Sequence, residues 1–568
     1  MEKNKLMKVK ELVTKVLPFY LFTFLPLCVV AQPSWVKKAT KSVFTLKTFG
    51  SDGTLIGSTG GFFVGEDGEA VSSFTPFKGA TTAVVIDAQG KEMDVACMLG
   101  ANETYDVAKF RVNAKKTAPL TIAAANASEN ATVWLLPYRE TKTLPQGTVR
   151  KAETFRDNNV YYTVALNMPE GTVSCPLMNE AGEVVGLMQQ PYKQNDSLSY
   201  AVSALFADSL KIGGLSINDA TLRSTFIKKD LPKELDQALL TLYVGQASVD
   251  SATYVEMLED FIARFPNAPD GYTYRAQIAT GDRRFADAAR DMEQAIKVAE
   301  KKDEAHFNYS KIIYQKELLM SQDAFAEWSL DKALEEAREA ERLQPQPIYR
   351  HQQAIILFAQ KKYAEAADIY ASLYDSDLRS AELFYEASRC KAAMKDSLGQ
   401  IALLDSCVAT FNQPYLKEAA PYILSRAHVL LDANQYRKAV NDLNEYEKLM
   451  QATVNANFYY LRFQAEVGGR LFQQALDDID QAIRMAPQYD LYYAEKASLQ
   501  VRVGMRDEAI ETAKECIKIA PDHSDGYLFL GLAQCLKGEK EEGLKNLKKA
   551  RELGDTQADT FIEKYTNQ

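Results

Sequence analysis

Histidine is scarce in this sequence of 568 residues, which contains four. They are His306, His351, His428 and His523, so the first half of the chain has none. Imidazole is the usual base that activates a serine or cysteine nucleophile near neutral pH. Residues 35–216 therefore cannot build a Ser-His-Asp or Cys-His site from their own side chains.

An excess of basic residues is also lacking. The net charge is -10, and residues 217–568 carry most of it, with 44 Lys/Arg against 56 Asp/Glu. Residues 35–216 are nearly balanced, with 17 Lys/Arg against 18 Asp/Glu. Binding to nucleic-acid phosphates requires a basic surface, so we expect no nucleic acid as a partner.

Patterns that hold metals or phosphates are missing as well. No Cys-x-x-Cys pair occurs and no histidine lies at ligand spacing from a cysteine, so we expect no metal and no other cofactor. The stretch STGG at 58–61 lacks the following lysine of a phosphate-binding loop. Six cysteines remain beyond residue 31: Cys97, Cys175, Cys390, Cys407, Cys516 and Cys535. Cys390 and Cys407 could pair across one helical hairpin in an oxidising compartment, and unpaired core cysteines are an equally good interpretation.

Apolar runs long enough to cross a bilayer are absent. The run VLPFYLFTFLPLCVVA follows five lysines, spans 16 residues and contains two prolines. Val29 and Ala31 supply small residues before Gln32, as at a signal-peptidase site. We predict that residues 1–31 are a cleaved signal peptide and that the mature chain has no membrane span. We expect an exported protein, periplasmic or secreted, of bacterial type.

A repeat with a period of 34 residues fills the C-terminal part of the sequence. Three sets of residues recur at that spacing: Ala475, Ala509 and Gly543; Ala482, Cys516 and Ala550; and Tyr459, Tyr493 and Tyr527. The apolar periodicity within each unit predicts a helix, a short turn and a second helix, and Pro487 and Pro521 close two successive units. Each hairpin leaves an apolar face bare until the next one stacks on it, so an extended array is the stable form.

This pattern resembles the tetratricopeptide repeat, with an aromatic residue early in the first helix, small residues at the helix crossing and a closing proline. The resemblance implies an all-α superhelical solenoid of eight or nine hairpins over residues 233–568. Such solenoids bind proteins or peptides in a groove lined by their first helices. The candidate groove residues are Tyr460, Gln464, Tyr492, Ala494 and Leu528. The repeated tyrosines at 459, 493 and 527 are interpreted as packing residues.

The N-terminal third has the short alternating runs and glycine-rich turns of an all-β barrel. In order, it contains TGGFFV, EDGEAV, SSFTPF, DVAKFRV and GTVSCPLMNEAGEVVGLM. This order resembles the HtrA-type trypsin-like serine proteases over about residues 35–212 and implies a trypsin-like double barrel. We therefore predict a multidomain chain, with the trypsin-like domain over 35–215, a linker over 216–232 and the solenoid after it.

The same resemblance places Thr75, Asp106 and Val173 where the family has its catalytic histidine, aspartate and serine. Only the aspartate matches. Threonine cannot take a proton from a nucleophile and valine cannot act as one. Asp106 is interpreted as a strand-edge residue or turn cap, and we expect no catalytic residue.

The loop around the missing nucleophile is changed too. Gly171 is retained, while Ser174 and Cys175 stand where the oxyanion loop has two flexible residues. Neither side chain is expected to replace the nucleophile, because each is displaced from the turn position and has no base nearby in sequence.

Two functions are compatible with this pattern. The first is an exported, non-catalytic protein-binding scaffold, in which the solenoid binds partners and the barrel has lost its triad but can pair with an extended peptide. The second is a serine-type endopeptidase with a non-standard active site or with chemistry supplied by a partner. A barrel that only caps the solenoid is a third interpretation. The lack of histidine in residues 35–216 favours the first.

Overall fold

The computed structural model describes residues 32–138, 141, 143–155, 159–192, 197–451 and 453–567. The predicted signal peptide, residues 1–31, lies outside this range. The chain divides into two compact units, Met1–Gly271 and Tyr272–Gln568, and each is described by itself. Within the described residues, no helix has both the length and the apolar character needed to span a bilayer.

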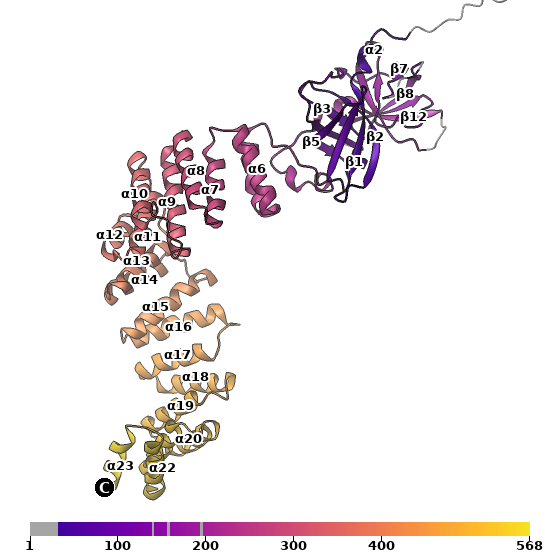
Figure 1. Ribbon diagram of the computed structural model, residues 1–568. Coiled ribbons are helices and arrows are strands. Elements are labelled where there is room, and N and C mark those ends of the chain that lie inside the picture. The colour runs from indigo at the N-terminus through magenta and orange to yellow at the C-terminus, as the bar shows by residue number, and fades with distance from the viewer. Residues whose placement is uncertain are drawn as a thin grey trace, which may run out of the picture. The chain divides into compact units, whose positions relative to one another are not determined.

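The first unit contains two closed antiparallel barrels of six strands each (Figure 1). The strands of the first barrel are β1 (Val43–Phe49), β2 (Leu55–Phe63), β3 (Glu69–Ser72), β4 (Thr82–Asp87), β5 (Glu92–Asn102) and β6 (Val107–Val112). Those of the second are β7 (Thr132–Leu135), β8 (Gln146–Phe155), β9 (Asn159–Ala165), β10 (Pro176–Met178), β11 (Val184–Met188) and β12 (Leu198–Ser203). The predicted trypsin-like double barrel is confirmed.

The barrel order explains the closure of each sheet. In the first barrel the strands follow the order β1-β2-β3-β6-β5-β4, and β4 pairs back onto β1. In the second the order is β10-β11-β12-β9-β8-β7, and β7 pairs back onto β10. Closure gives each strand a neighbour on both sides over part of its length. Residues 55–61 of β2 pair only with β1 in the described ladders, so that stretch of β2 keeps one open edge.

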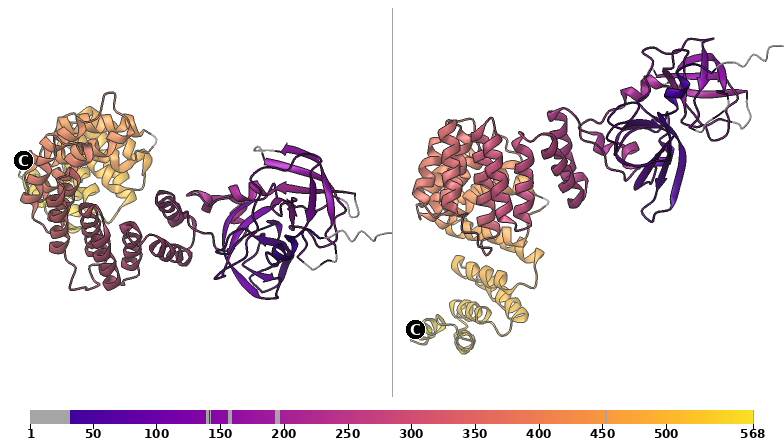
Figure 2. Two further views of the ribbon diagram at one scale, coloured as in Figure 1. Left: turned by 90° about the horizontal axis from the view of Figure 1, so that it is seen from above. Right: turned by 45° about the horizontal axis from the view of Figure 1, so that its top comes forward.

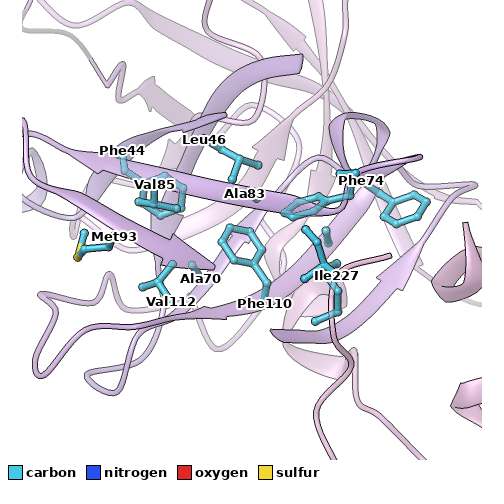
Figure 3. Packing of buried hydrophobic residues seen from close by; sticks show 14 of the residues in the cluster. Phe44, Leu46, Ala70, Phe74, Ala83, Val85, Met93, Phe110, Val112 and Ile227 are labelled. Atoms are coloured by element: carbon cyan, nitrogen blue, oxygen red, sulfur yellow. The ribbon is translucent and has the colours of Figure 1, made fainter. Parts of the chain in front are cut away.

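Alternating side chains fill the first barrel. Phe44, Phe74, Phe77 and Phe110 are fully buried, and the rings of Phe77 and Phe110 lie 5.1 Å apart. Figure 3 shows Phe44, Phe74 and Phe110 in this cluster. A second cluster combines residues of both barrels: Val43, Phe62, Val71, Tyr105, Leu136, Met178, Val184 and Val202 are among its members. This shared core holds the two barrels together and fixes the junction between them.

Residues 216–232 do not form the predicted linker. They contain η2 (Ser216–Asn218) and α4 (Ala220–Arg223), and Leu222 and Ile227 are buried in the core of the first barrel. Figure 3 shows Ile227 in that core. The backbone at Met98 in β5 donates to Lys228 and accepts from Asp230. The segment therefore belongs to the barrel, because its apolar side chains complete the core there.

Asp230 joins this segment to the first helical hairpin. Its carboxylate accepts from Arg111 of β6 at 3.1 Å and from Arg264 at 2.6 Å. Arg264 lies at the end of α6 (Ser251–Arg264), which follows α5 (Leu235–Ser248). Asp230 has only 12% of its side chain exposed, whereas Arg111 and Arg264 are partly exposed, so the ion pairs are screened by water from the arginine side. The first hairpin is thus tied to the barrels within one unit.

Helices make up the rest of the chain and follow one another as hairpins (Figures 1 and 2). After α5 and α6 they are α7 (Pro269–Gly281), α8 (Phe285–Val298), α9 (Lys302–Leu319), α10 (Leu330–Leu343), α11 (Pro347–Ala359), α12 (Tyr363–Ser372), α13 (Ala381–Ala393), α14 (Ser397–Val408), α15 (Ala420–Asp432), α16 (Tyr436–Met450), α17 (Ala456–Gly468), α18 (Phe472–Met485), α19 (Asp490–Val503), α20 (Arg506–Ile519), α21 (Ser524–Lys537), α22 (Lys540–Glu552) and α23 (Ala558–Thr566). The predicted all-helical region after the barrels is confirmed.

The residues of the 34-residue period lie where helices cross. Ala475, Ala509 and Ala482 are fully buried. A Cβ atom on Gly543 would approach Cys535 Sγ to 2.4 Å, so only glycine allows α22 to pack this closely against α21. The small residues of the repeat therefore set the helix spacing.

In each of three hairpins, a largely buried ion pair joins the two helices. The arginine of the first helix donates from Nε and one terminal nitrogen to both oxygens of an aspartate 16 residues later, over 2.6 to 2.9 Å. The pairs are Arg275–Asp291, Arg426–Asp442 and Arg462–Asp478. Such forked contacts fix direction as well as distance, so they hold each hairpin in one register.

Candidate functional site

A cleft of about 740 Å³ opens where the two barrels meet. The first barrel supplies residues from β2 and from the segment after β3, and the second supplies the loop before β10 and the ends of β11 and β12. The described lining residues are Ser58, Thr59, Ser73, Thr75, Pro76, Asp106, Tyr138, Met168, Pro169, Glu170, Gly171, Val173, Gln190, Pro191, Leu198 and Ser199. The three positions predicted from the triad of the resemblance therefore line one cleft.

Thr75 and Asp106 contact each other directly. Asp106 Oδ1 accepts from the Thr75 backbone N–H at 2.6 Å and from the Thr75 hydroxyl at 2.8 Å. Thr75 begins the short 3-10 helix η1 (Thr75–Phe77), so the carboxylate caps that helix end. This agrees with the interpretation of Asp106 as a cap, and the threonine hydroxyl that faces it can donate a hydrogen bond but cannot serve as a base.

Val173 lies on a tight turn between Thr172 and Cys175. The Cys175 N–H donates to the Thr172 carbonyl at 3.3 Å, and the Ser174 N–H donates to Met188 of β11 at 2.9 Å. Ser174 has φ of +65°, a left-handed conformation that costs a non-glycine residue about 1 kcal/mol or more. The surrounding contacts must therefore stabilise the turn enough to keep Ser174 in this conformation.

Hydrogen bonds of the Ser174 hydroxyl supply this stabilisation. This hydroxyl lies 3.0 Å from the Thr59 hydroxyl, accepts from the Ser73 N–H at 3.2 Å and hydrogen-bonds the Ser73 hydroxyl. Ser174 is fully buried and Ser73 is 2% exposed. We call these three side chains, Thr59, Ser73 and Ser174, the hydroxyl cluster. It joins the two barrels beneath the turn, and no described side chain in it can act as a general base.

Cys175 is equally unsuited to nucleophilic attack. It is fully buried, and burial raises the pKa of its thiol to about 12. The thiolate that reacts is therefore not populated near neutral pH. The side chain packs beside Gly60, where an added Cβ would come within 3.1 Å of the sulfur.

Two residues of the turn that line the cleft have backbone N–H groups without an acceptor among the described residues. Neither Gly171 nor Val173 donates its N–H to an acceptor in the described part of the chain, and both residues line the cleft. Gly171 has φ of +77°, which glycine adopts without strain. A pair of unfilled donors on a concave surface can bind an oxygen atom of a ligand.

Comparison with known proteins agrees with this architecture. Residues 58–187 match the trypsin-like peptidase domain family. Residues 422–536, inside the helical region, match the family described as anaphase-promoting complex subunit 5. No curated protein matches the chain.

Solved structures with similarity to the trypsin-like domain include two of the Rv3671c protease from M. tuberculosis. The active form is 18% identical, covers 31% of this chain and 82% of its own, and has a TM-score of 0.27. The Ser343Ala mutant in its inactive form is 18% identical, covers 32% of this chain and 91% of its own, and has the same TM-score.

The candidate groove residues of the helical array are largely buried, which corrects the prediction. Tyr492, Ala494 and Leu528 are 1%, 3% and 4% exposed, and the Tyr492 hydroxyl donates to Asn457 at 2.9 Å. Successive first helices pack on these side chains, so they are part of the core. Gln464 is exposed, and Tyr460 is half-buried with its hydroxyl 3.2 Å from Glu495 Oε1.

The cysteines and histidines of the helical region do not form an evident reactive site among the described residues. The six cysteines among the described residues are all unpaired, so Cys390 and Cys407 do not form the disulfide considered from the sequence. His306 and His351 each lie within 2.6 Å of a glutamate, Glu336 and Glu386 respectively. The described residues contain no group of three or more side chains arranged to ligate a metal ion.

The sequence did not point to Thr59 and Ser73 as parts of the site. Ser73 lies two residues before Thr75 in the motif SSFTPF, but nothing in the sequence places it against Ser174, 101 residues later. The sequence did contain one indication: Ser174 and Cys175 stand at two positions where the family has flexible residues. A non-glycine residue in a left-handed conformation requires compensating contacts, so contacts to Ser174 could have been expected.

Proposed function

We propose that this chain is an exported, non-catalytic protein-binding scaffold. The cleft of the trypsin-like domain holds an extended peptide segment without cutting it, and the helical array binds protein partners. The observation that carries the proposal is the make-up of the cleft: Thr75 is bound to Asp106, Val173 occupies the tip of the turn, and the described lining contains no histidine, lysine or cysteine.

A cleft can bind a peptide without the nucleophile and the base that a peptidase needs for cleavage. An extended peptide is held chiefly through its backbone, by hydrogen bonds that do not involve a nucleophile or a base. The open N–H groups of Gly171 and Val173 supply two donors for a peptide carbonyl. Tyr138, Met168 and Leu198 supply apolar surface for its side chains.

The helical array supports the second half of the proposal. Its repeat resembles the tetratricopeptide repeat, and stacked helical hairpins of this kind present extended surfaces to other proteins. Arrays of this type have no catalytic role of their own, which is consistent with the burial of Cys390, Cys407 and Cys516 and with the pairing of His306 and His351 with glutamates.

A serine-type endopeptidase with a non-standard site is the second candidate, favoured by the match of residues 58–187 to a family named for peptidases. Ser174 is the nearest hydroxyl to the turn position. Its burial and its three hydrogen bonds within the hydroxyl cluster weigh against attack on a peptide in the cleft.

The test of catalysis compares the chain from Gln32 to Gln568 with its Val173→Ser variant. Each is treated with a fluorophosphonate probe for serine hydrolases and incubated with casein. We expect neither protein to be labelled and neither to cleave, because a serine at 173 still has no base. Labelling of the unaltered chain would establish the endopeptidase function, and mapping the labelled residue would identify the side chain that acts.

The test of binding uses short random peptides displayed against the immobilised chain. A Val173→Trp variant, in which the larger side chain projects into the cleft, serves as the control and is checked for folding by circular dichroism. We expect the unaltered chain to enrich a set of peptides and the variant to lose them. Equal enrichment by both proteins would place the binding outside the cleft and overturn the role of the barrel.

A further inference from the structure

The described lining of the cleft contains carboxylates and no cationic side chain. Asp106 and Glu170 line it, and none of its described lining residues is Lys, Arg or His. Glu170 is exposed to solvent, whereas Asp106 is half-buried. Because partial burial strengthens an ionic interaction relative to the surface, a bound cation should interact more strongly with Asp106 than with Glu170.

One oxygen of Asp106 is unused. Oδ1 takes both hydrogen bonds from Thr75, while Oδ2 has no hydrogen bond or ion pair with any residue that the structure describes. The threonine is bound back against the carboxylate. It is also shorter than the histidine that the sequence resemblance places at 75, so it leaves the carboxylate in contact with the cleft.

The position of Asp106 relative to the turn suits a bound peptide. Gly171 and Val173, whose N–H groups have no acceptor in the described part of the chain, line the same cleft as Asp106. A peptide carbonyl bound by these donors would therefore lie in the cleft that contains Asp106, where a neighbouring side chain of the peptide can meet the carboxylate. A carboxylate with a free oxygen pairs best with a cationic partner, since charge-assisted hydrogen bonds are about twice as strong as neutral ones.

We infer that Asp106 is a specificity-determining residue that selects an extended peptide segment with a lysine or arginine at one position. This rests on the proposed binding of peptides in the cleft and adds to it the chemical class of the ligand. The aspartate that a peptidase uses to orient a histidine thus becomes a direct contact to the ligand in this chain.

The experiment extends the peptide selection to two variants of the chain from Gln32 to Gln568, Asp106→Asn and the matched control Glu170→Gln. We expect the unaltered chain to enrich Lys or Arg at a single position of the peptides. Asp106→Asn should abolish this preference and Glu170→Gln should retain it. The asparagine still accepts the Thr75 hydrogen bonds, so the cap and the fold are preserved.

One enriched peptide is then synthesised with its cationic residue and with methionine in its place, and binding is followed by fluorescence polarisation. We expect the cationic peptide to lose roughly tenfold in affinity on Asp106→Asn, as hydrogen bonds to charged groups typically do when they are lost. The methionine peptide should bind the two proteins equally.

The outcomes separate this inference from the proposed function. Peptides that bind the cleft with no preference for Lys or Arg, or with a preference that survives Asp106→Asn, overturn the role of Asp106 and leave peptide binding intact. A preference lost in Glu170→Gln alone assigns the cation to Glu170 and likewise overturns the inference. If no peptide is enriched, or if Val173→Trp enriches the same ones, the proposed binding in the cleft fails first and the inference falls with it.

Discussion

The cleft of the barrels and the Arg–Asp pairs of the helical array differ in how completely their polar groups are hydrogen-bonded. In the array, Arg462 donates to Asp478 and Glu447, and the predicted groove residues Tyr492 and Leu528 are buried. In the cleft, Oδ2 of Asp106 and the N–H of Val173 have no partner in the described part of the chain. Folded proteins rarely leave such groups unpaired unless a ligand or water completes them.

The difference separates polar groups that hold the fold from polar groups that are available for binding. Both regions contain an aspartate that accepts hydrogen bonds, Asp106 in the cleft and Asp478 in the array. The two differ in whether a carboxylate oxygen is left without a partner. Asp106 keeps an open oxygen toward the cleft, whereas Asp478 has both oxygens bound by one arginine.

The variant with the largest expected effect on this comparison is Arg462→Met in α17. Arg462 is 8% exposed and is surrounded by Asp478, Glu447 and Glu466. Removing one partner of a buried ion pair leaves charges without compensation, so we expect the helical region to lose about 3–5 kcal/mol of stability. Urea unfolding followed by far-ultraviolet circular dichroism measures this.

The matched control for that variant is Arg484→Met on the neighbouring helix α18. Arg484 is exposed and its guanidinium contacts Gln481, so we expect a loss within about 0.5 kcal/mol. Similar losses for both variants would mean that the Arg–Asp pairs contribute no more than surface arginines, and the contrast with the cleft would disappear.

A second test uses pH, at Glu466 in the same group. Glu466 is 3% exposed and its Oε2 has no hydrogen-bond partner. Burial, with the charge of Asp478 next in importance, raises its pKa from 4.5 to about 8. The folded pKa exceeds the unfolded one, so the stabilisation that Glu466 gives is complete below about pH 4.5 and is lost as pH rises to about 8. Glu466→Gln should remove this dependence and raise stability near pH 9 by about 2–4 kcal/mol.

Urea midpoints measured from about pH 5 to about pH 9 check the pH dependence. Glu508→Gln, at an exposed position of α20, is the control and should follow the unaltered chain. If the curves of the unaltered chain and Glu466→Gln run parallel over this range, Glu466 is charged in the folded state. The array would then tolerate an excess of buried negative charge that we do not expect.

The sequence was sufficient for the elements whose pattern is local. The helices follow from their apolar period, and the barrel strands from alternation between glycine-rich turns. It was not sufficient for residues 216–232, where Leu222 and Ile227 are too far apart to form a strand or helix pattern yet both complete the barrel core. Burial of that kind depends on what the rest of the chain brings alongside.

The residues of the site also divide into those that the sequence predicts and those that it does not. The family order of motifs located Thr75, Asp106 and Val173, because the spacing of anchors along the chain is visible in the sequence. The groove prediction for Tyr492 and Leu528 was wrong because the first helices are apolar on more than one face, so their periodicity does not show which face remains exposed. The contact of Ser73 with Ser174 bridges two barrels and had no local signal.

The smallest expected effect tests that contact, through Ser174→Ala and Ser174→Gly. Both variants remove the hydroxyl that Thr59 and Ser73 share and leave their buried polar groups with one partner fewer, at a cost of about 1–3 kcal/mol. Glycine also relieves the positive φ of +65°, so Ser174→Gly should be the more stable of the two by up to about 1 kcal/mol. Thermal unfolding of the barrel unit, followed by tryptophan fluorescence, gives the order. Two variants as stable as the unaltered chain would show that the hydroxyl cluster does not hold the turn, and the cleft would then owe its shape to the shared apolar core alone.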